Sequence, residues 1–104
     1  MHPEALEWVS RYACDAELAV LDIGGRNING SPRAMFPNAD YTVLDISPGE
    51  GVDIVANAAT WTPDRHYDLV IACEVFEHTD AWPQICTTAH KACREGGRFI
   101  TTMA

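Results

Sequence analysis

Residues 20–31 are the part of this sequence whose residue types and spacing are best suited to bind a ligand. Their sequence, VLDIGGRNINGS, is an apolar run followed by a turn with three glycines. Glycine lets the backbone take positive φ angles and approach a ligand closely, because it has no Cβ. Ligands of open α/β sheets bind at the carboxyl ends of the strands, where such a turn would lie. The segment therefore predicts a nucleotide-type binding site.

Two common nucleotide-binding motifs are disfavoured by the spacing of these glycines. A dinucleotide site needs GxGxxG, but counting from Gly24 places Arg26 and Asn29 at the second and third glycine positions. A P-loop needs Lys and then Ser or Thr after its last glycine to hold phosphate and magnesium, and here Ser31 and Pro32 follow. A nucleotide-dependent oxidoreductase and an NTPase are both disfavoured for this reason.

A third pattern remains, with an acidic residue two positions before a glycine and a second acidic residue at the end of the next apolar run. Asp22, Gly24 and Asp45 supply it. A carboxylate can accept hydrogen bonds from both hydroxyls of a cis-diol, and hydrogen bonds to charged groups contribute about 1.5–3 kcal/mol each. Asp45 is therefore a candidate for binding a ribose. Asp22 has a second interpretation, in which its side chain only caps the glycine turn.

Five short apolar or β-branched runs predict the strands that must carry these residues. They cover residues 19–23, 41–46, 52–56, 67–73 and 98–103. Apolar residues at helical spacing predict helices over residues 3–12 and 82–93, and Ser31 with Pro32 predicts the start of a shorter one. Strands that alternate with helices pair in parallel through right-handed crossovers. The predicted fold class is therefore α/β, with an open Rossmann-like parallel sheet in a single domain spanning residues 1–104.

With these motifs in this order, the chain resembles the class I S-adenosylmethionine-dependent methyltransferases. The sequence LDIGGRNING at residues 21–30 is similar to the first motif of the family, and CEVFEH at residues 73–78 is similar to the fourth. The sequence REGGRF at residues 94–99 resembles the turn before strand five. The resemblance implies a sheet of seven strands in the order 3-2-1-4-5-7-6, of which this chain supplies 3-2-1-4-5 and lacks strands 6 and 7.

The resemblance also implies which residues bind S-adenosyl-L-methionine. The glycine turn would pass under the methionine end, Asp45 would bind both ribose hydroxyls, and Asn57 would lie beside the adenine amino group. Arg26 departs from the family, because many members have another glycine there, and its side chain is expected to narrow or cover the pocket. The implied cofactor-binding residues are Asp22, Gly24, Gly25, Asn27, Asp45, Ile46, Asn57, Ala58, Cys73 and Glu74.

The motifs identify no catalytic residue with certainty. Methyl transfer from a sulfonium is a direct displacement, in which the protein mainly aligns acceptor, methyl group and sulfur and excludes water. His78 is a candidate proton acceptor near the methyl group, and its alternative interpretation is a helix cap or a surface contact. No motif identifies the methyl acceptor.

A metal site is a further possibility that the sequence disfavours. Cys86, His90 and Cys93 share one helical face. However, Trp82 and Ala89 lie on the same stripe, which favours core packing, and a structural zinc site wants a fourth ligand. We predict no metal site.

Composition limits the partners of the chain. Its net charge of −8 disfavours non-specific binding to nucleic acid, so we expect a small-molecule methyl acceptor. No apolar stretch approaches the roughly twenty residues of a membrane-spanning helix, and the first residues do not resemble a signal peptide. We therefore expect no membrane contact, a cytoplasmic location and four free cysteines.

The fifth predicted strand would form an open edge of the sheet, which natural proteins normally cover. We expect either that the sequence belongs to a longer protein or that two copies cover each other's edge in a homodimer. The alternative to an enzyme is a non-catalytic binding or assembly module that keeps the methyltransferase-like fold.

Overall fold

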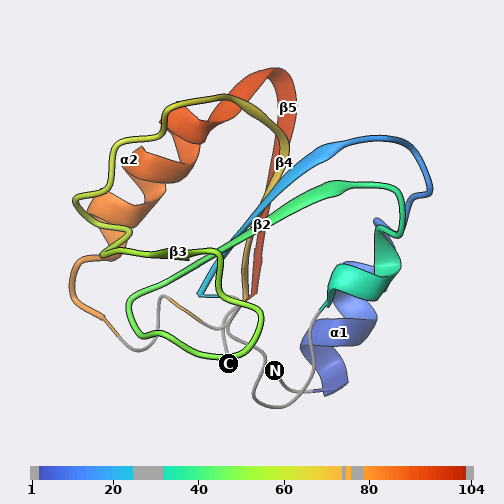
Figure 1. Ribbon diagram of the computed structural model, residues 1–104, viewed down its shortest axis with the longest axis horizontal. Helices are drawn as coiled ribbons and strands as arrows, with labels where there is room; N and C mark the ends of the chain where they lie inside the picture. The colour runs from blue at the N-terminus through green and yellow to red at the C-terminus, as the bar shows by residue number, and fades with distance from the viewer. Residues whose placement is uncertain (1–2, 25–31, 74, 76–78, 103–104) are drawn as a thin grey trace.

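The computed structural model describes residues 3–24, 32–73, 75 and 79–102, which form a parallel sheet with helices on both sides (Figure 1). The strands of this described part have the order β3-β2-β1-β4-β5, and each neighbouring pair is parallel. The predicted fold class and strand order are therefore confirmed. The elements are α1 (Pro3–Ser10), β1 (Ala19–Ile23), the 3₁₀ helix η1 (Pro32–Met35), β2 (Asp40–Asp45), β3 (Ile54–Val55), β4 (Tyr67–Cys73), α2 (Trp82–Ala92) and β5 (Cys93–Thr102).

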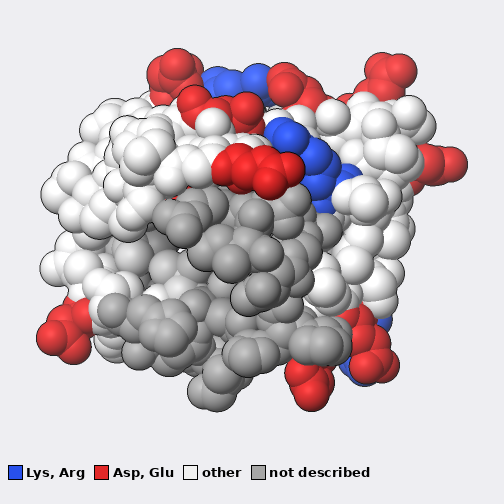
Figure 2. Space-filling model, turned by 60° about the horizontal axis from the view of Figure 1, so that its bottom comes forward, with Lys and Arg blue, Asp and Glu red and all other residues white. Residues whose placement is uncertain are grey.

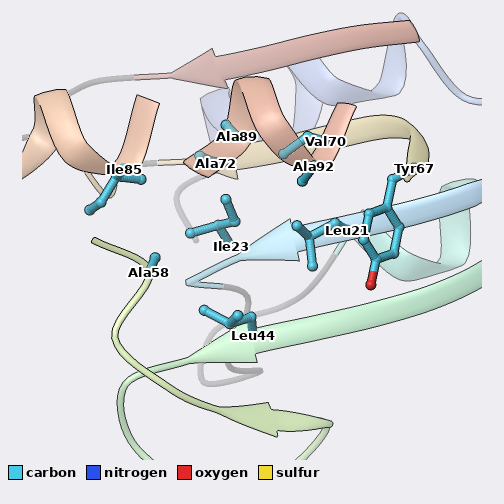
Figure 3. Packing of buried hydrophobic residues seen from close by; sticks show 10 residues of the cluster. All are labelled: Leu21, Ile23, Leu44, Ala58, Tyr67, Val70, Ala72, Ile85, Ala89 and Ala92. Carbon is cyan, nitrogen blue, oxygen red and sulfur yellow. The ribbon is translucent and has the colours of Figure 1, made fainter. Parts of the chain in front are cut away.

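The sheet buries apolar side chains on both faces, because α1 covers one face and α2 the other (Figure 1). Successive residues of a strand point to opposite faces, so β1 contributes Leu21 and Ile23 to the α2 side and Val20 to the α1 side. Figure 3 shows the cluster on the α2 side, which contains Leu21, Ile23, Leu44, Ala58, Tyr67, Val70, Ala72, Ile85, Ala89 and Ala92. The cluster on the α1 side contains Val9, Val20, Phe36, Tyr41, Val43, Leu69, Ile71, Cys73 and Ile100.

The edge strands differ from their predicted bounds. β3 is only two residues long, because the amide of Val52 donates to the carbonyl of Gly49 in a turn. The carboxylate of Asp53 also accepts a hydrogen bond from the amide of Val43 (2.8 Å). β5 begins at Cys93 instead of residue 98, because Cys93 pairs with Tyr67 before the register shifts. Gly96 lies in this irregular stretch with a φ angle of 79°.

The apolar stripe of α2 also differs from the prediction. Trp82, which was expected to lie on the stripe, is the first residue of the helix and is 52% exposed. Burial begins one turn later, at Ile85. Cys86 and Cys93 are half-buried and pack against the cluster on the α2 side. All four cysteines are free, as predicted.

The described residues also bear on metal and membrane binding. Within the part of the chain that the structure describes, no group of three or more His, Cys, Asp or Glu residues could hold a metal ion. Over the same ranges, every helix is too short or too polar to cross a membrane.

Candidate functional site

The carboxyl ends of the strands bring the predicted site residues onto one edge of the sheet. The register pairs Ile23 of β1 with both Leu44 of β2 and Ala72 of β4. The next residue of each strand therefore lies in the same row, which places Gly24 between Asp45 and Cys73. Neighbouring strands are about 4.8 Å apart, so these three residues can contact one ligand.

This edge faces the lower part of Figure 1, towards which β1, β2, β4 and β5 run. Figure 2 brings that side forward and shows acidic side chains at several separate places around it, with basic side chains beside some of them. Gly25, Asn27, Glu74 and His78, which the sequence assigned to this site, lie outside the described residues.

Gly24 has a backbone conformation and surroundings that require glycine. Its φ angle is 72°, in the left-handed region that other residues rarely adopt. A Cβ at this position would lie 2.7 Å from Cγ2 of Val75. The amide of Gly24 donates to the carbonyl of Leu44 (2.7 Å), which ties the start of the turn to β2. Any other residue at this position would therefore strain the backbone and clash with Val75.

Asp45 is the last residue of β2 and is held by hydrogen bonds on both sides. Its Oδ1 accepts a hydrogen bond from the amide of Ser47 (3.0 Å), and its carbonyl accepts one from the amide of Ala56 (3.0 Å). The side chain is half-buried. Ile46 follows it and is 68% exposed. A fixed carboxylate thus lies beside an exposed apolar side chain, which suits a ligand with a diol and an aromatic base.

Asp22 lies at this end of β1 but points into the core. Its side chain is 1% exposed, and it accepts a hydrogen bond from the hydroxyl of Tyr41 (2.6 Å). Burial raises the pKa of this carboxyl to about 7. The hydrogen bond from Tyr41 and the positive charge of Arg33 lower the pKa, while the charge of Asp45 raises it. A buried carboxyl with a pKa of about 7 therefore lies two residues before Gly24.

Arg33 is the cation that faces this carboxyl from η1. Its guanidinium donates to the carbonyl of Tyr41 (2.9 Å) and lies 5.1 Å from the centre of the Tyr41 ring. It also pairs with the carboxylate of Asp53 (3.4 Å). Tyr41 and Arg33 were not predicted as part of the site. Tyr41 is four residues before Asp45, and only the observed register shows that it faces Asp22.

The turn after β3 is held by its own backbone and by α2. The Oδ1 of Asn57 accepts from the amide of Ala59 (2.9 Å), and its carbonyl accepts from the amides of Thr60 and Trp61. Ala58 is buried. Its carbonyl accepts a short hydrogen bond from the hydroxyl of Thr88 (2.6 Å). Thus α2 fixes the position of Ala58, which follows the residue that the resemblance placed beside the adenine, Asn57.

Thr88 is a positioning residue that the sequence analysis missed. It is 5% exposed and lies between Ile85 and Ala92 on the buried stripe of α2. A polar residue at a core position needs a hydrogen-bond partner, and this signal was present in the sequence. Cys73, in contrast, is buried in the cluster on the α1 side at the end of β4, where it pairs with Thr102 of β5.

The chain belongs to the family of the methyltransferase domain, whose sequence model matches residues 1–104. The family predicted from the order of the motifs is therefore confirmed. No curated protein matches the chain.

Solved structures with a similar fold include three proteins in complex with S-adenosylhomocysteine. The complex of DhpI with S-adenosylhomocysteine (SAH) has 24% sequence identity and a TM-score of 0.70, over 95% of this chain and 54% of that one. Coclaurine N-methyltransferase, bound to N-methylheliamine and SAH, has 16% identity and a TM-score of 0.72, over 94% and 34%. The glycopeptide N-methyltransferase MtfA, complexed with SAH, also has 16% identity and a TM-score of 0.72, over 94% and 50%. The chain thus spans about half the length of these proteins or less.

Proposed function

We propose that this chain binds S-adenosyl-L-methionine at the carboxyl edge of its sheet and serves as the cofactor-binding part of a methyltransferase. The row formed by Gly24, Asp45 and Cys73 is the observation that carries the proposal. Membership of the methyltransferase domain family supports it, as do structural neighbours solved with SAH, the product of that cofactor.

The residues present fit this cofactor. The carboxylate of Asp45 can accept both ribose hydroxyls, and the exposed side chain of Ile46 offers an apolar surface to the adenine. Asn57 and Ala58, held by α2, would border the base from the next strand. The cofactor carries a sulfonium and an ammonium, so two carboxyl groups and no phosphate-binding lysine suit it.

Bound S-adenosylmethionine supplies a methyl group activated by its sulfonium. The chain's own contribution is then to hold the cofactor in one orientation. Asp45 fixes the ribose, and the turn at Gly24 leaves room for the methionine end. Asp22 and Tyr41 form a rigid pair beneath that turn. Alignment of this kind lowers the entropic part of the barrier for a direct displacement. No general base is required for it, so His78 stays only a prediction.

We also propose a small molecule as the methyl acceptor and a second copy of the chain as the partner of β5. The chain has 15 acidic and 7 basic residues, which favours a small molecule over nucleic acid. In the described part of the chain, β5 pairs with β4 on one side and forms the edge of the sheet. A second β5 could cover that edge. The cytoplasmic location stays a prediction.

The experiment that tests cofactor binding is titration calorimetry with SAH on Asp45→Ala and Asp40→Ala. Asp40 is a matched control, because it lies at the other end of the same strand with its exposed carboxylate paired to Arg65 (2.8 Å). We expect Asp45→Ala to weaken binding about tenfold or more, since it removes hydrogen bonds to a charged acceptor. Asp40→Ala should leave the affinity within about twofold.

Two outcomes would contradict the proposal, one for the role of Asp45 and the other for cofactor binding itself. Equal affinities of Asp45→Ala and the unmodified protein would remove the ribose assignment while leaving cofactor binding. The absence of any binding or thermal stabilisation at millimolar SAH would favour the non-catalytic module.

A further inference from the structure

A pocket at the amino edge of the sheet gathers three of the seven basic residues of the chain. It has a volume of about 460 Å³, and its lining includes Arg11, Arg94 and Arg98. Leu18, just before β1, and Asp68, near the start of β4, also line it. The pocket is therefore at the opposite end of the strands from Gly24 and Asp45. In a chain with a net charge of −8, this local excess of positive charge requires an explanation.

The negative charge of Asp68, the acidic residue of the lining, is already balanced by contacts within the chain. One carboxylate oxygen of Asp68 accepts a hydrogen bond from the amide of Ala19 (2.8 Å), and the other is paired with Arg94. The amide of Ala19 first, and Arg94 second, hold the pKa of Asp68 below its usual value. Asp68 is thus ionised and balances only Arg94.

The other two arginines leave an excess of positive charge in the pocket. The side chain of Arg98 is exposed and makes no hydrogen bond or ion pair with any part of the chain that the structure describes. The guanidinium of Arg11 lies 5.2 Å from the centre of the Trp8 ring, a contact that orients it but does not neutralise its charge. Among the residues that the structure describes, the lining therefore carries two positive charges without an acidic partner.

The irregular stretch within β5 sets the spacing of two of these arginines. Gly96 has a φ angle of 79°, which favours glycine. A Cβ on Gly97 would lie 2.8 Å from Sγ of Cys93 and 2.9 Å from the carbonyl oxygen of Asp68. Both glycines suit this irregularity of the strand, and Arg94 and Arg98 lie on either side of it.

We propose that this pocket binds the phosphate monoester group of a small molecule. Arginine binds phosphate oxygens through paired hydrogen bonds from its planar guanidinium. A phosphate monoester carries a charge of about −1.5 to −2 at neutral pH, which matches the unbalanced charge of Arg11 and Arg98. The apolar side chains of Leu18 and Leu69 line the same pocket and can contact the carbon atoms attached to the phosphate.

The test is titration calorimetry of the chain with phenyl phosphate as the probe, at about 0.15 M salt to screen non-specific attraction. Arg98→Gln should weaken binding about tenfold or more, and Arg11→Gln should also weaken it, because each removes charge-assisted hydrogen bonds. Lys91→Gln is the matched control, since it removes one positive charge from an exposed position on α2 outside the pocket. It should change the affinity less than about twofold.

Further probes and controls make the result decisive. Inorganic phosphate should bind more weakly than phenyl phosphate, and phenol should not bind measurably. Circular dichroism confirms that each variant is folded, and Arg11→Gln replaces Arg98→Gln if the latter is not. The proposal is overturned if Lys91→Gln weakens binding as much as Arg98→Gln, if phenol binds as well as phenyl phosphate, or if phenyl phosphate shows no saturable binding at about 10 mM.

Discussion

The buried carboxyl of Asp22 should make the stability of this protein depend on pH, and Asp22→Asn should remove that dependence. An aspartate has a pKa of 3.8 in the reference state, and burial raises that of Asp22 to about 7. Between these values the folded state binds more protons than the unfolded state. Stability from this group is therefore fully present below about pH 4, and it is lost as the pH rises through about 7.

The size of the effect follows from the shift in pKa. One pKa unit corresponds to about 1.4 kcal/mol, so a shift of about three units corresponds to about 4 kcal/mol in total. About 3 kcal/mol of this would be lost between about pH 5 and about pH 8. This is a large part of the roughly 5–15 kcal/mol that stabilises a small domain. The burial of Asp22, which is 1% exposed, is what makes the effect so large.

Urea unfolding of the two proteins at several pH values measures the effect. The difference in unfolding free energy between Asp22→Asn and the unmodified protein isolates Asp22, because the other ionisable groups are common to both. From about pH 5 to about pH 8, the unfolding free energy of Asp22→Asn should rise by about 3 kcal/mol relative to that of the unmodified protein. Tyr41→Phe should move the transition to higher pH, since it removes a hydrogen bond that favours the ionised form.

A difference that stays constant over this range would refute the reasoning. It would mean that Asp22 is hydrated or paired well enough to keep an ordinary pKa in the folded state.

Two other predictions concern the glycine turn and the edge of the sheet. Gly24→Ala should destabilise the protein by more than Gly96→Ala, whose cost should be about 1–2 kcal/mol. Both glycines have similar positive φ angles. However, the new Cβ at Gly24 would clash with Val75 at 2.7 Å, whereas at Gly96 it would lie 3.5 Å from the side chain of Arg94, an ordinary contact. Thermal or urea unfolding of both variants checks this, and equal costs would remove the packing argument. If β5 pairs with a second copy, light scattering should show a dimer; a monomer at all concentrations would exclude the homodimer.

The central strands could be predicted from sequence because they are fully buried. β1 and β4 begin and end at the predicted residues, since strands covered on both faces are continuous apolar runs. The edge strands could not be predicted as well, because their bounds depend on tertiary contacts. The pairing of Cys93 with Tyr67 lengthens β5, and the turn at Val52 shortens β3.

Only part of the candidate site could be predicted from the sequence, for a similar reason. Asp45 and Gly24 could be identified because their types and order along the chain form a motif. The contact between Asp22 and Tyr41 joins residues 19 positions apart, and it depends on the register of β1 against β2. Likewise, the sequence does not show that Val75 closes the space above Gly24. Thr88 was missed by the sequence analysis, although its spacing from Ile85 and Ala92 could have indicated a buried polar residue.

The parallel sheet separates the two proposed sites and makes them independent. All carboxyl ends lie on one edge, with Asp22 and Asp45, and all amino ends lie on the other, with Arg11 and Arg98. A five-residue strand such as β1 spans about 15 Å, whereas salt screens exposed charges beyond about 8 Å at physiological ionic strength. A charge change at one edge should therefore leave binding at the other edge nearly unaltered. For this reason, loss of SAH affinity in Asp45→Ala and loss of phenyl phosphate affinity in Arg98→Gln would report on separate sites.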